Sequence, residues 1–470
     1  MLIDSTNTNT LPTNQSVKLR LTLMSFMQFF VWGSWLITIA NYWFETKKWA
    51  GPDFGDVFGT LGFSSLIMPT IVGIIADKWV SAQRLYGILH FMGGLILCCL
   101  PMVNDSSTFF WVIFAAMICY MPTISLSNSI GYTILKNNHF DVVKVFPPIR
   151  VWGTIGFIAA MWFVSLTGNK ASYNQFIISG IAGILLGIYS FTLPNCPPGL
   201  NSSNKKSISQ TFGLDAFKLF ANKKTALFFL FSMMLGAALQ LTNMYGDVFI
   251  SEFNYFGKYQ GSLITKYSTM IMSISQISET LFILAIPFFL RRFGIKQVML
   301  ISMFAWVLRF GLLAYGNPVE GLWMIIVSCI VYGMAFDFFN VSGSLYIETT
   351  TDSKIRSSAQ GLFMMMTNGF GAVIGSLLSA RIIASFFTLS FNDSASLTKY
   401  LGINSDNEVF TRLTENVKIA SNGSFSSTIQ LRDWQPIWIT FALYALVIAL
   451  LFAIFFKHKH NPEEIQEISH

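Results

Sequence analysis

Charged residues are scarce in this chain of 470 residues, where Asp, Glu, Lys and Arg together make up 11%. Soluble domains usually carry about 25% of these residues. Hydrophobic residues account for 53% of the chain, Phe alone occurs 46 times, and the mean hydropathy is +0.55. So little polar surface cannot cover a chain of this length in water, and we expect lipid to surround much of it. This composition excludes a soluble cytosolic enzyme and a disordered chain.

Cysteine and histidine are also rare, with five residues of each. Four of the Cys lie in or beside apolar stretches, without C-x-x-C or other metal-ligand spacing, which indicates small buried hydrophobes. The chain has no G-x-x-x-x-G-K-[ST] loop that would bind ATP. The net charge of +7 comes from basic residues that are spread among the loops. We therefore expect no metal, no cofactor and no nucleic-acid partner.

Apolar stretches of about 20 residues or more, the length that crosses a bilayer as a helix, occur twelve times. The first is too long for the core of a signal peptide, so we keep it as a membrane helix. The sequence thus predicts an all-α, polytopic membrane protein with twelve transmembrane helices. These spans fall near residues 22–44, 56–76, 84–103, 109–135, 148–167, 173–194, 225–250, 264–290, 296–315, 321–346, 357–390 and 434–456.

Two polar stretches interrupt the spacing of the spans. The first is rich in Pro, Ser and Lys and predicts a cytoplasmic linker at 195–224, with a short amphipathic segment. It separates an N-terminal six-helix half, 1–194, from a C-terminal half, 225–470. The second, near 392–433, is rich in Asn, Ser and Thr, and we interpret it as a long exposed loop on the outer side.

The distribution of basic residues predicts the orientation in the membrane. Of the 30 Lys and Arg, 18 lie in the termini and in the loops on the same side as the termini, against nine in the opposite loops. Cytoplasmic loops carry the excess of Lys and Arg. We therefore expect both termini to be cytoplasmic.

Ionisable side chains inside a span cost at least ~2.5–3.5 kcal/mol on insertion scales, so each needs a partner or a function. Glu279, Asp337, Arg309 and Arg150 are of this kind. Amides and aromatic residues accompany them at helical spacing, and hydrocarbon offers such groups no partner, so these faces point into the bundle. The faces hold Arg150, Thr154 and Phe157; Gln240 and Asn243; Gln276 and Glu279; and Tyr332, Phe336 and Asp337.

Structural interpretations compete with a binding role at several of these positions. Gln28 can be an amide that joins helices by hydrogen bonds. Arg309 can pair within the C-terminal half. Glu279 and Asp337 can belong to a permanent structural ion pair with a buried Arg. We favour a binding role for the two acids, because a single buried Arg would not neutralise both.

The residue types restrict the chemistry of a ligand. Acids and amides bind hydroxyl groups, and aromatic rings offer faces for a flat ring. A cluster of Arg and Lys, as a phosphate would need, is missing. A small neutral solute with hydroxyl groups and a planar or apolar face fits best, and sugar and nucleoside remain equally open. An intramembrane enzyme is disfavoured, because the five His lie outside these acid and amide faces.

Two basic turns resemble the signature loop of the major facilitator superfamily. They are Gly73-Ile-Ile-Ala-Asp77-Lys78-Trp-Val-Ser-Ala-Gln-Arg84 and Leu290-Arg-Arg-Phe-Gly294-Ile-Lys296, which follow the second span of each half. The first turn departs from the pattern, because the Gly expected after its basic residues is absent. The resemblance implies two six-helix halves with the substrate between them near the midplane. It also implies a gating role for Asp77.

Longer strings resemble the nucleoside–proton symporter family, most closely its enterobacterial members. They are Gln28-Phe-Phe-Val-Trp-Gly-Ser-Trp35, Phe146-Pro-Pro-Ile-Arg-Val-Trp-Gly-Thr-Ile-Gly-Phe157, Met272-Ser-Ile-Ser-Gln-Ile-Ser-Glu-Thr-Leu-Phe282, Phe336-Asp-Phe-Phe-Asn340 and Thr367-Asn-Gly-Phe-Gly371. The resemblance covers nearly the whole chain and implies a transporter of the bacterial inner membrane that takes up purine and pyrimidine nucleosides with protons. A sugar–proton symporter of the same fold is the alternative.

The same resemblance implies roles for particular residues. It assigns substrate binding to Arg150, Thr154, Phe157, Gln240, Asn243, Gln276, Glu279, Tyr332 and Phe336. Asp337 is our choice of proton carrier, with Glu279 as the second candidate, because a carboxyl group can be neutral in a dry cavity and charged in a wet one, whereas Arg stays charged. Nucleoside, proton and lipid are the expected partners, and we expect a monomer.

Overall fold

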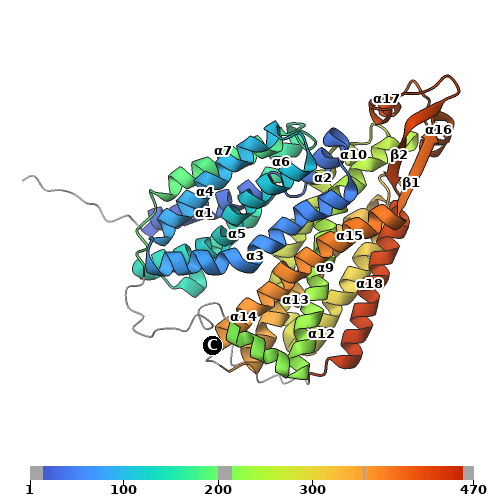
Figure 1. Cartoon of the computed structure of the whole chain (residues 1–470). Coiled ribbons are helices and arrows are strands. Elements are labelled where there is room, and N and C mark those ends of the chain that lie inside the picture. Colours follow the sequence, from blue (N-terminus) through green and yellow to red (C-terminus); the bar gives the residue numbers. More distant parts are fainter. Residues whose placement is uncertain (1–13, 199–213, 353–354, 459–470) are drawn as a thin grey trace, which may run out of the picture.

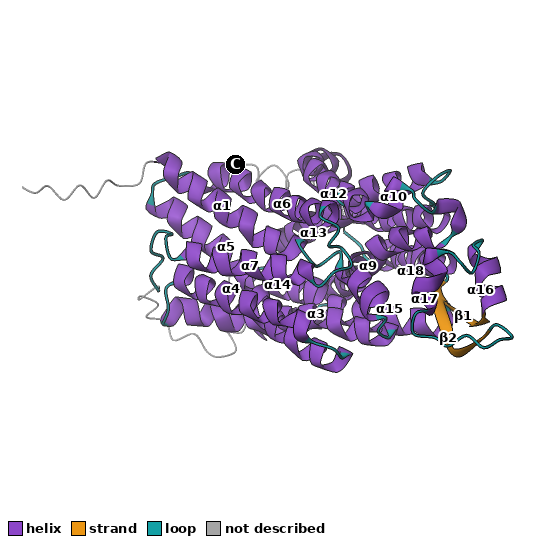
Figure 2. Ribbon diagram, turned by 90° about the horizontal axis from the view of Figure 1, so that it is seen from above, coloured by secondary structure: helices purple, strands orange, loops and turns teal. Residues whose placement is uncertain are grey.

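The computed structural model describes residues 14–198, 214–352 and 355–458. Within them the chain is helical apart from one two-stranded sheet, which lies at one end of the molecule (Figures 1 and 2). The helices form two bundles in chain order. The first bundle holds α1 (Asn14–Gly33), α2 (Ile39–Asn41), the π-helix η1 (Tyr42–Lys47), α3 (Gly51–Lys78), α4 (Ala82–Cys99), α5 (Ser106–Asn137), α6 (Val142–Leu166) and α7 (Asn174–Ser190).

The second bundle follows the short helix η3 (Leu214–Ala221). Its helices are α9 (Lys223–Glu252), α10 (Leu263–Lys266), α11 (Ser268–Met272), α12 (Ile274–Tyr315), α13 (Leu322–Thr350), α14 (Arg356–Met364), the π-helix η6 (Met365–Gly371), α15 (Ala372–Phe386) and α18 (Trp434–Phe455). Of the predicted linker 195–224, residues 199–213 lie outside the described residues. The boundaries of the two halves, 1–194 and 225–470, remain a prediction from the sequence.

Nine helical stretches within the described residues are long and apolar enough to cross a membrane. One of them, Ser268–Tyr315, is too long for one pass at about 1.5 Å per residue, and its backbone leaves the helical region at Gly294, where φ is 77°. It therefore makes two passes. α7, with 17 residues, and α1 with its continuation through η1 supply two more. The all-α, polytopic fold with twelve transmembrane helices is thus confirmed.

The start of α6 differs from the predicted span. The helix begins at Val142, six residues before the expected start at 148, and includes Pro147 and Pro148 in its second turn. The fixed φ of Pro, about −65°, suits a helix, and a missing N–H matters least near the N-terminus. Arg150 consequently lies two turns inside a continuous helix.

Glycines let helices within each bundle approach closely. A Cβ on Gly156 of α6 would lie 2.1 Å from the carbonyl oxygen of Phe26 on α1, and a Cβ on Gly236 of α9 would lie 2.1 Å from that of Thr367 in η6. Small residues of this kind are typical of helix contacts in membranes, where packing replaces the hydrophobic effect. The first contact fixes α6 against α1, and the second fixes η6 against α9.

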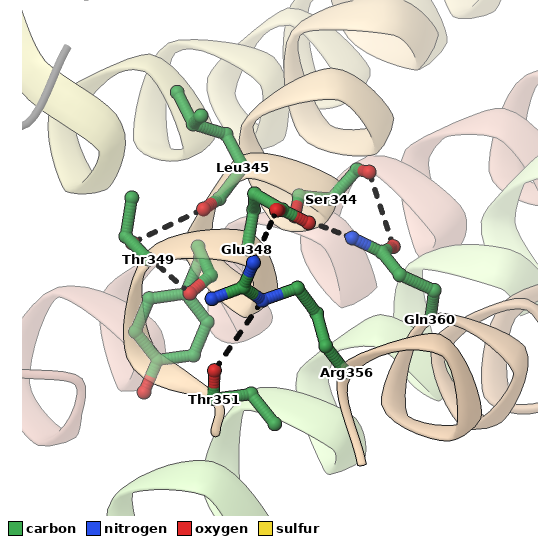
Figure 3. A network of polar contacts seen from close by, with 8 residues as sticks. Ser344, Leu345, Glu348, Thr349, Thr351, Arg356 and Gln360 are labelled. Carbon is green, nitrogen blue, oxygen red and sulfur yellow. Dashed lines mark hydrogen bonds and ion pairs between the residues drawn. The ribbon is translucent and has the colours of Figure 1, made fainter. Parts of the chain in front are cut away.

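Polar contacts hold the corner between α13 and α14 (Figure 3). Arg356 forms an ion pair with Glu348 at 2.8 Å and donates a second bond to the carbonyl of Thr351. Gln360 donates to the carbonyl of Ser344 at 2.8 Å and accepts from its hydroxyl at 3.0 Å. These contacts fix the return of the chain at the end of the bundle where α18 also ends.

The stretch near 392–433, expected as an exposed loop, is folded. Strand β1 (Thr388–Asp393) pairs antiparallel with β2 (Ser424–Arg432), and α16 (Ser394–Leu401) and α17 (Glu408–Thr414) lie between them in sequence. The carboxylate of Asp393 caps α16 by accepting from the N–H of Ser396, which lowers the pKa of Asp393. An apolar core made by this segment includes Phe391, Leu397, Leu401, Phe410 and Ile429. We call residues 388–432 the hairpin module, and its side of the molecule the hairpin end.

The two bundles meet at the hairpin end. Hydrogen bonds between bundles, within the described residues, join Asn41 to Asp247 and Ser251, Lys170 to Thr265 and Ser268, and Trp162 to Ser273. An ion pair at 3.0 Å joins Arg381 to Asp56. In Figure 1 the bundles diverge away from this end, so the molecule is closed at the hairpin end.

We expect Gly156→Ala to lower the melting temperature of the detergent-solubilised protein. The added methyl group would overlap the backbone of α1, and overpacking of this kind costs about 1–3 kcal/mol. Gly311→Ala on α12 is the matched control, since nothing lies within 4 Å of the added Cβ, and the higher helix propensity of Ala should leave its stability unchanged or higher. Equal melting temperatures for the two variants would contradict the close contact of α1 and α6.

Candidate functional site

Helix α6 presents Arg150, Thr154 and Phe157 on one face of the first bundle. The guanidinium of Arg150 lies 4.1 Å from the centroid of the Phe29 ring on α1. Phe157 is buried and meets the indole of Trp32 edge to face, with ring centroids 6.3 Å apart. Thr154 lies half-buried one turn after Arg150. The contact of α1 with α6 therefore positions the aromatic and basic groups of this face.

The two predicted acids lie on neighbouring helices, Glu279 on α12 and Asp337 on α13. Gly333 on α13 packs against the backbone of Ser278 and Glu279, where an added Cβ would lie 2.6–2.7 Å away. Asp337 follows Gly333 by one turn on the same helix. It is 5% exposed, and its Oδ2 is buried without a hydrogen-bond partner within the described residues. The charges of Glu279 and Asp337 are close enough to interact with each other.

Aromatic rings flank these acids on α13. The rings of Tyr332 and Phe336 are parallel within 4°, with centroids 6.0 Å apart. The guanidinium of Arg309 lies 4.6 Å from the centroid of the Tyr332 ring on its other side and donates to the carbonyl of Ser328 at 2.7 Å. Phe336 is only half-buried, so part of its ring is free to contact a ligand.

Amide groups on α9 and α12 complete the predicted set. The side-chain oxygens of Gln240 and Gln276 are buried and accept no hydrogen bond within the described residues. Asn243 is half-buried one turn after Gln240. Buried acceptors without a donor are uncommon in folded proteins, because each costs about 1–3 kcal/mol. A donor from a ligand or from water would remove that cost.

Electrostatics link the two faces. The charge of Arg150 on α6 acts on Glu279 on α12, and these two helices are in contact across the bundles. Within the described residues, neither Glu279 nor Asp337 lies within ion-pair distance of a basic side chain. A permanent ion pair with Arg309, one structural interpretation of these acids, is therefore not formed.

A small cavity lies beside this set. It has a volume of about 20 Å³ and is lined by Leu239, Trp306, Phe336, Asn340 and Asn368, among others. This volume suffices for a water molecule but not for a solute with a ring. Asn340 donates to the carbonyl of Phe336 at 3.1 Å, so its amide also serves the helix itself.

Other predicted positions have simpler surroundings. Asp77 is exposed at the end of α3, without an ion pair in the described part of the chain, and its gating role stays a prediction. Gln28 joins helices, as its structural interpretation held: it donates to Thr123 at 2.9 Å and accepts from Tyr86 at 2.7 Å. The search for metal ligands, made on the described residues alone, finds no group of three or more His, Cys, Asp or Glu.

Sequence reasoning missed two buried polar residues. Asp247 is 1% exposed and accepts hydrogen bonds from Asn41 and from Thr269. It lies inside the predicted span 225–250, so the presence of an acid in an apolar stretch was the signal that could have found it. His90, expected outside the polar faces, lies 2.7 Å from the side-chain oxygen of Gln28. A His at the helical spacing of i+4 from Tyr86 was the available signal there.

Comparisons with known proteins identify the family of the chain. The family model described as "Nucleoside H+ symporter" matches residues 15–404. The nucleoside permease NupG of Escherichia coli K12 is 44% identical over 458 residues, which cover 97% of this chain and 100% of the relative. The xanthosine permease of the same organism is 44% identical over 452 residues, covering 96% and 98%.

A solved structure resembles this chain in fold as well as in sequence. The crystal structure of the nucleoside transporter NupG superposes with a TM-score of 0.80 at 44% identity, covering 94% of this chain and 100% of the other. The sugar alternative is not favoured, because the family model and these relatives are nucleoside transporters. The chain belongs to the nucleoside–H+ symporter family, a family of multi-pass transporters of the bacterial inner membrane and not of enzymes.

Proposed function

We propose that this chain takes up purine and pyrimidine nucleosides together with protons by alternating access, at a site between its two bundles. The observation that carries the proposal is the contact between α6, which holds Arg150, and α12, which holds Glu279, with neither side chain in an ion pair within the described residues. A solute that donates to Glu279 and accepts from Arg150 would bridge the bundles. Such a site is typical of transporters that bind substrate at the midplane.

Each part of a nucleoside finds a suitable group here. Ribose hydroxyls can donate to Glu279 and to the unpartnered oxygen of Gln276, and base edges can bond the amides of Gln240 and Asn243. The rings of Phe157 and Phe336 offer stacking faces for the base from opposite bundles. Tyr332 supports the second of these rings by its parallel stacking.

Proton coupling is assigned to Asp337. Asp337 is 5% exposed and has one carboxyl oxygen without a partner within the described residues, and Arg309, a buried cation of the same bundle, contacts Ser328 and the Tyr332 ring. A charge that is buried without a counter-ion is costly, so a proton can bind when the site is dry and leave when it is wet. The membrane potential supplies ~2.3 kcal/mol per charge per 100 mV, which supports roughly 50-fold accumulation for one proton.

We propose further that both termini are cytoplasmic, as the bias of Lys and Arg favours. The hairpin module then lies on the outer side, and the described conformation is closed outside and open toward the cytoplasm. One chain contributes both faces of the site, so we propose that the monomer is the transporting unit.

Glu279→Gln should weaken uridine binding by tenfold or more at normal protein abundance, because hydrogen bonds to a charged group contribute about 1.5–3 kcal/mol. Equilibrium binding of labelled uridine to the purified protein measures the effect. Glu320→Gln is the control, since Glu320 is an exposed acid paired with Lys258 at the hairpin end. Unchanged affinity in a folded Glu279→Gln variant would remove Glu279 from the site.

Phe157→Ala and Phe336→Ala should each lower affinity by several-fold to about tenfold, since an aromatic pair contributes about 0.5–1.5 kcal/mol beyond its buried area. Replacement by Tyr should be tolerated at both positions. Phe304→Ala controls for the loss of a ring from a membrane helix, because Phe304 is 44% exposed on the bundle surface. Normal binding by both Ala variants would show that the base is not stacked at these rings.

Asp337→Asn should retain nucleoside binding and exchange but lose accumulation driven by a proton gradient. The neutral amide imitates the protonated acid, so the site can cycle with substrate but cannot release a proton. Uptake into proteoliposomes, with and without an imposed pH gradient, separates the two activities, and Asp406→Asn in the hairpin module is the control. Gradient-driven accumulation by Asp337→Asn would exclude Asp337 as the coupling residue.

A further inference from the structure

A second cavity lies at the hairpin end, away from the proposed transport site. Its volume is about 460 Å³, within the range of about 300–1,000 Å³ that is usual for small-molecule sites. Segments from three parts of the chain line it: residues 44–52, which run from η1 into the start of α3 in the first bundle, the ends of α9 and α15 in the second bundle, and the hairpin module. We call it the hairpin cavity.

The lining of the hairpin cavity combines aromatic rings with a few polar groups. Phe44, Trp49, Tyr245 and Tyr255 line the cavity; Phe44 and Trp49 are half-buried, whereas Tyr245 and Tyr255 are buried and present little of their rings. Trp49 is half-buried, so its indole is partly open to the cavity. This is the composition expected of a site for a solute with a flat ring, because aromatic faces contact it and a small number of polar groups orient it.

Most of the charges around the hairpin cavity are already paired. Arg432 forms an ion pair with Glu252 and lies 3.8 Å from the centroid of the Phe44 ring. Lys48 pairs with Glu415 at 3.1 Å. Both pairs hold the wall of the cavity, so Lys48, Glu252 and Arg432 are already paired.

One acid and one base remain available. Glu45 accepts from Ser251 at 3.2 Å through one oxygen, and its other oxygen has no hydrogen bond within the described residues. The guanidinium of Arg412 lies 5.7 Å from the centroid of the Tyr255 ring, is exposed, and forms no hydrogen bond or ion pair in the described part of the chain. A ligand here can therefore donate hydroxyl groups to Glu45 and accept from Arg412.

We propose that the hairpin cavity is a second nucleoside site, which binds the external substrate and inhibits its uptake. The ring faces suit a base, and Glu45 and Arg412 suit the hydroxyls of a sugar and the carbonyl groups of a base. The choice of a nucleoside among solutes with a ring and hydroxyl groups rests on the proposed function.

The inhibition follows from the position of the cavity between the bundles. Residues 44–52 belong to the first bundle, whereas Arg412 and Tyr255 belong to the second bundle and its module. Lys48 also donates to the carbonyl of Arg412 at 2.8 Å, so the cavity exists in this form only while the outer end is closed. A ligand that binds one conformation shifts the population toward it. Nucleoside in the hairpin cavity thus delays the return to the outward-open state.

Equilibrium dialysis of labelled uridine against the purified full-length protein tests the proposal. We expect two uridines per wild-type chain, and one each for Glu279→Gln and for Arg412→Ala, which should weaken its site by tenfold or more. Lys418→Ala is the matched control, an exposed base of the same module that does not line the cavity. Glu45→Gln provides a second variant from the opposite wall, with the same expectation as Arg412→Ala.

Uptake by whole cells provides the functional readout. Wild-type uptake should decline at high external uridine, whereas Arg412→Ala should reach a plateau without decline. One uridine per wild-type chain, lost in Glu279→Gln and kept in Arg412→Ala, would overturn the second site and leave the proposed function intact. Absence of any uridine binding or transport by the wild type would instead overturn the proposed function. Sucrose and uridine monophosphate serve as competitors for the second site. If either displaces the second labelled uridine better than unlabelled uridine does, the assignment to nucleosides is overturned.

Discussion

The hydrogen bond between Asn41 and Asp247 joins the two bundles at a point that is shielded from solvent. One oxygen of Asp247 accepts from Asn41 and Thr269, and the other has no partner within the described residues. An unsatisfied buried acceptor costs about 1–3 kcal/mol, and water removes that cost when the bundles separate. The hydrogen bonds of Asp247 therefore align the closed end, while its unpartnered oxygen lowers the cost of separating the bundles.

The second bundle also contains buried charged groups that are only partly paired. Arg309 is fully buried, yet among the described residues it contacts the Tyr332 ring, the Ser275 hydroxyl and a backbone carbonyl and forms no ion pair with a carboxylate. Glu279 and Asp337 are thereby left without a counter-ion from their own bundle, and the charge that acts on Glu279 comes from Arg150 in the other. The site is electrostatically incomplete in either bundle alone.

Much of the fold could be predicted from the sequence, because a membrane helix is recognised by a run of about 20 apolar residues. The ends of helices could not: Pro147 and Pro148 predicted a boundary, but φ near −65° lets both remain inside α6. The hairpin module was not predicted because polar residues are interspersed among its apolar ones. At the site, unpaired acids in apolar spans identified Glu279 and Asp337. The same rule applied to Asp247, which lies near the end of its span, where an acid is usually attributed to the interface. Contacts between the bundles, such as that of Asn41 with Asp247, depend on the conformation of the transporter. A single sequence contains no pattern that predicts them.

The hairpin module begins and ends at one place on the bundle. Thr388 and Arg432 are paired partners in the sheet, and α15 and α18 continue directly from them into the membrane. Its apolar core is almost wholly its own, with Tyr255 as the contribution from the end of α9. Residues can therefore be gained or lost beyond the base of the hairpin while the twelve membrane passes keep their register.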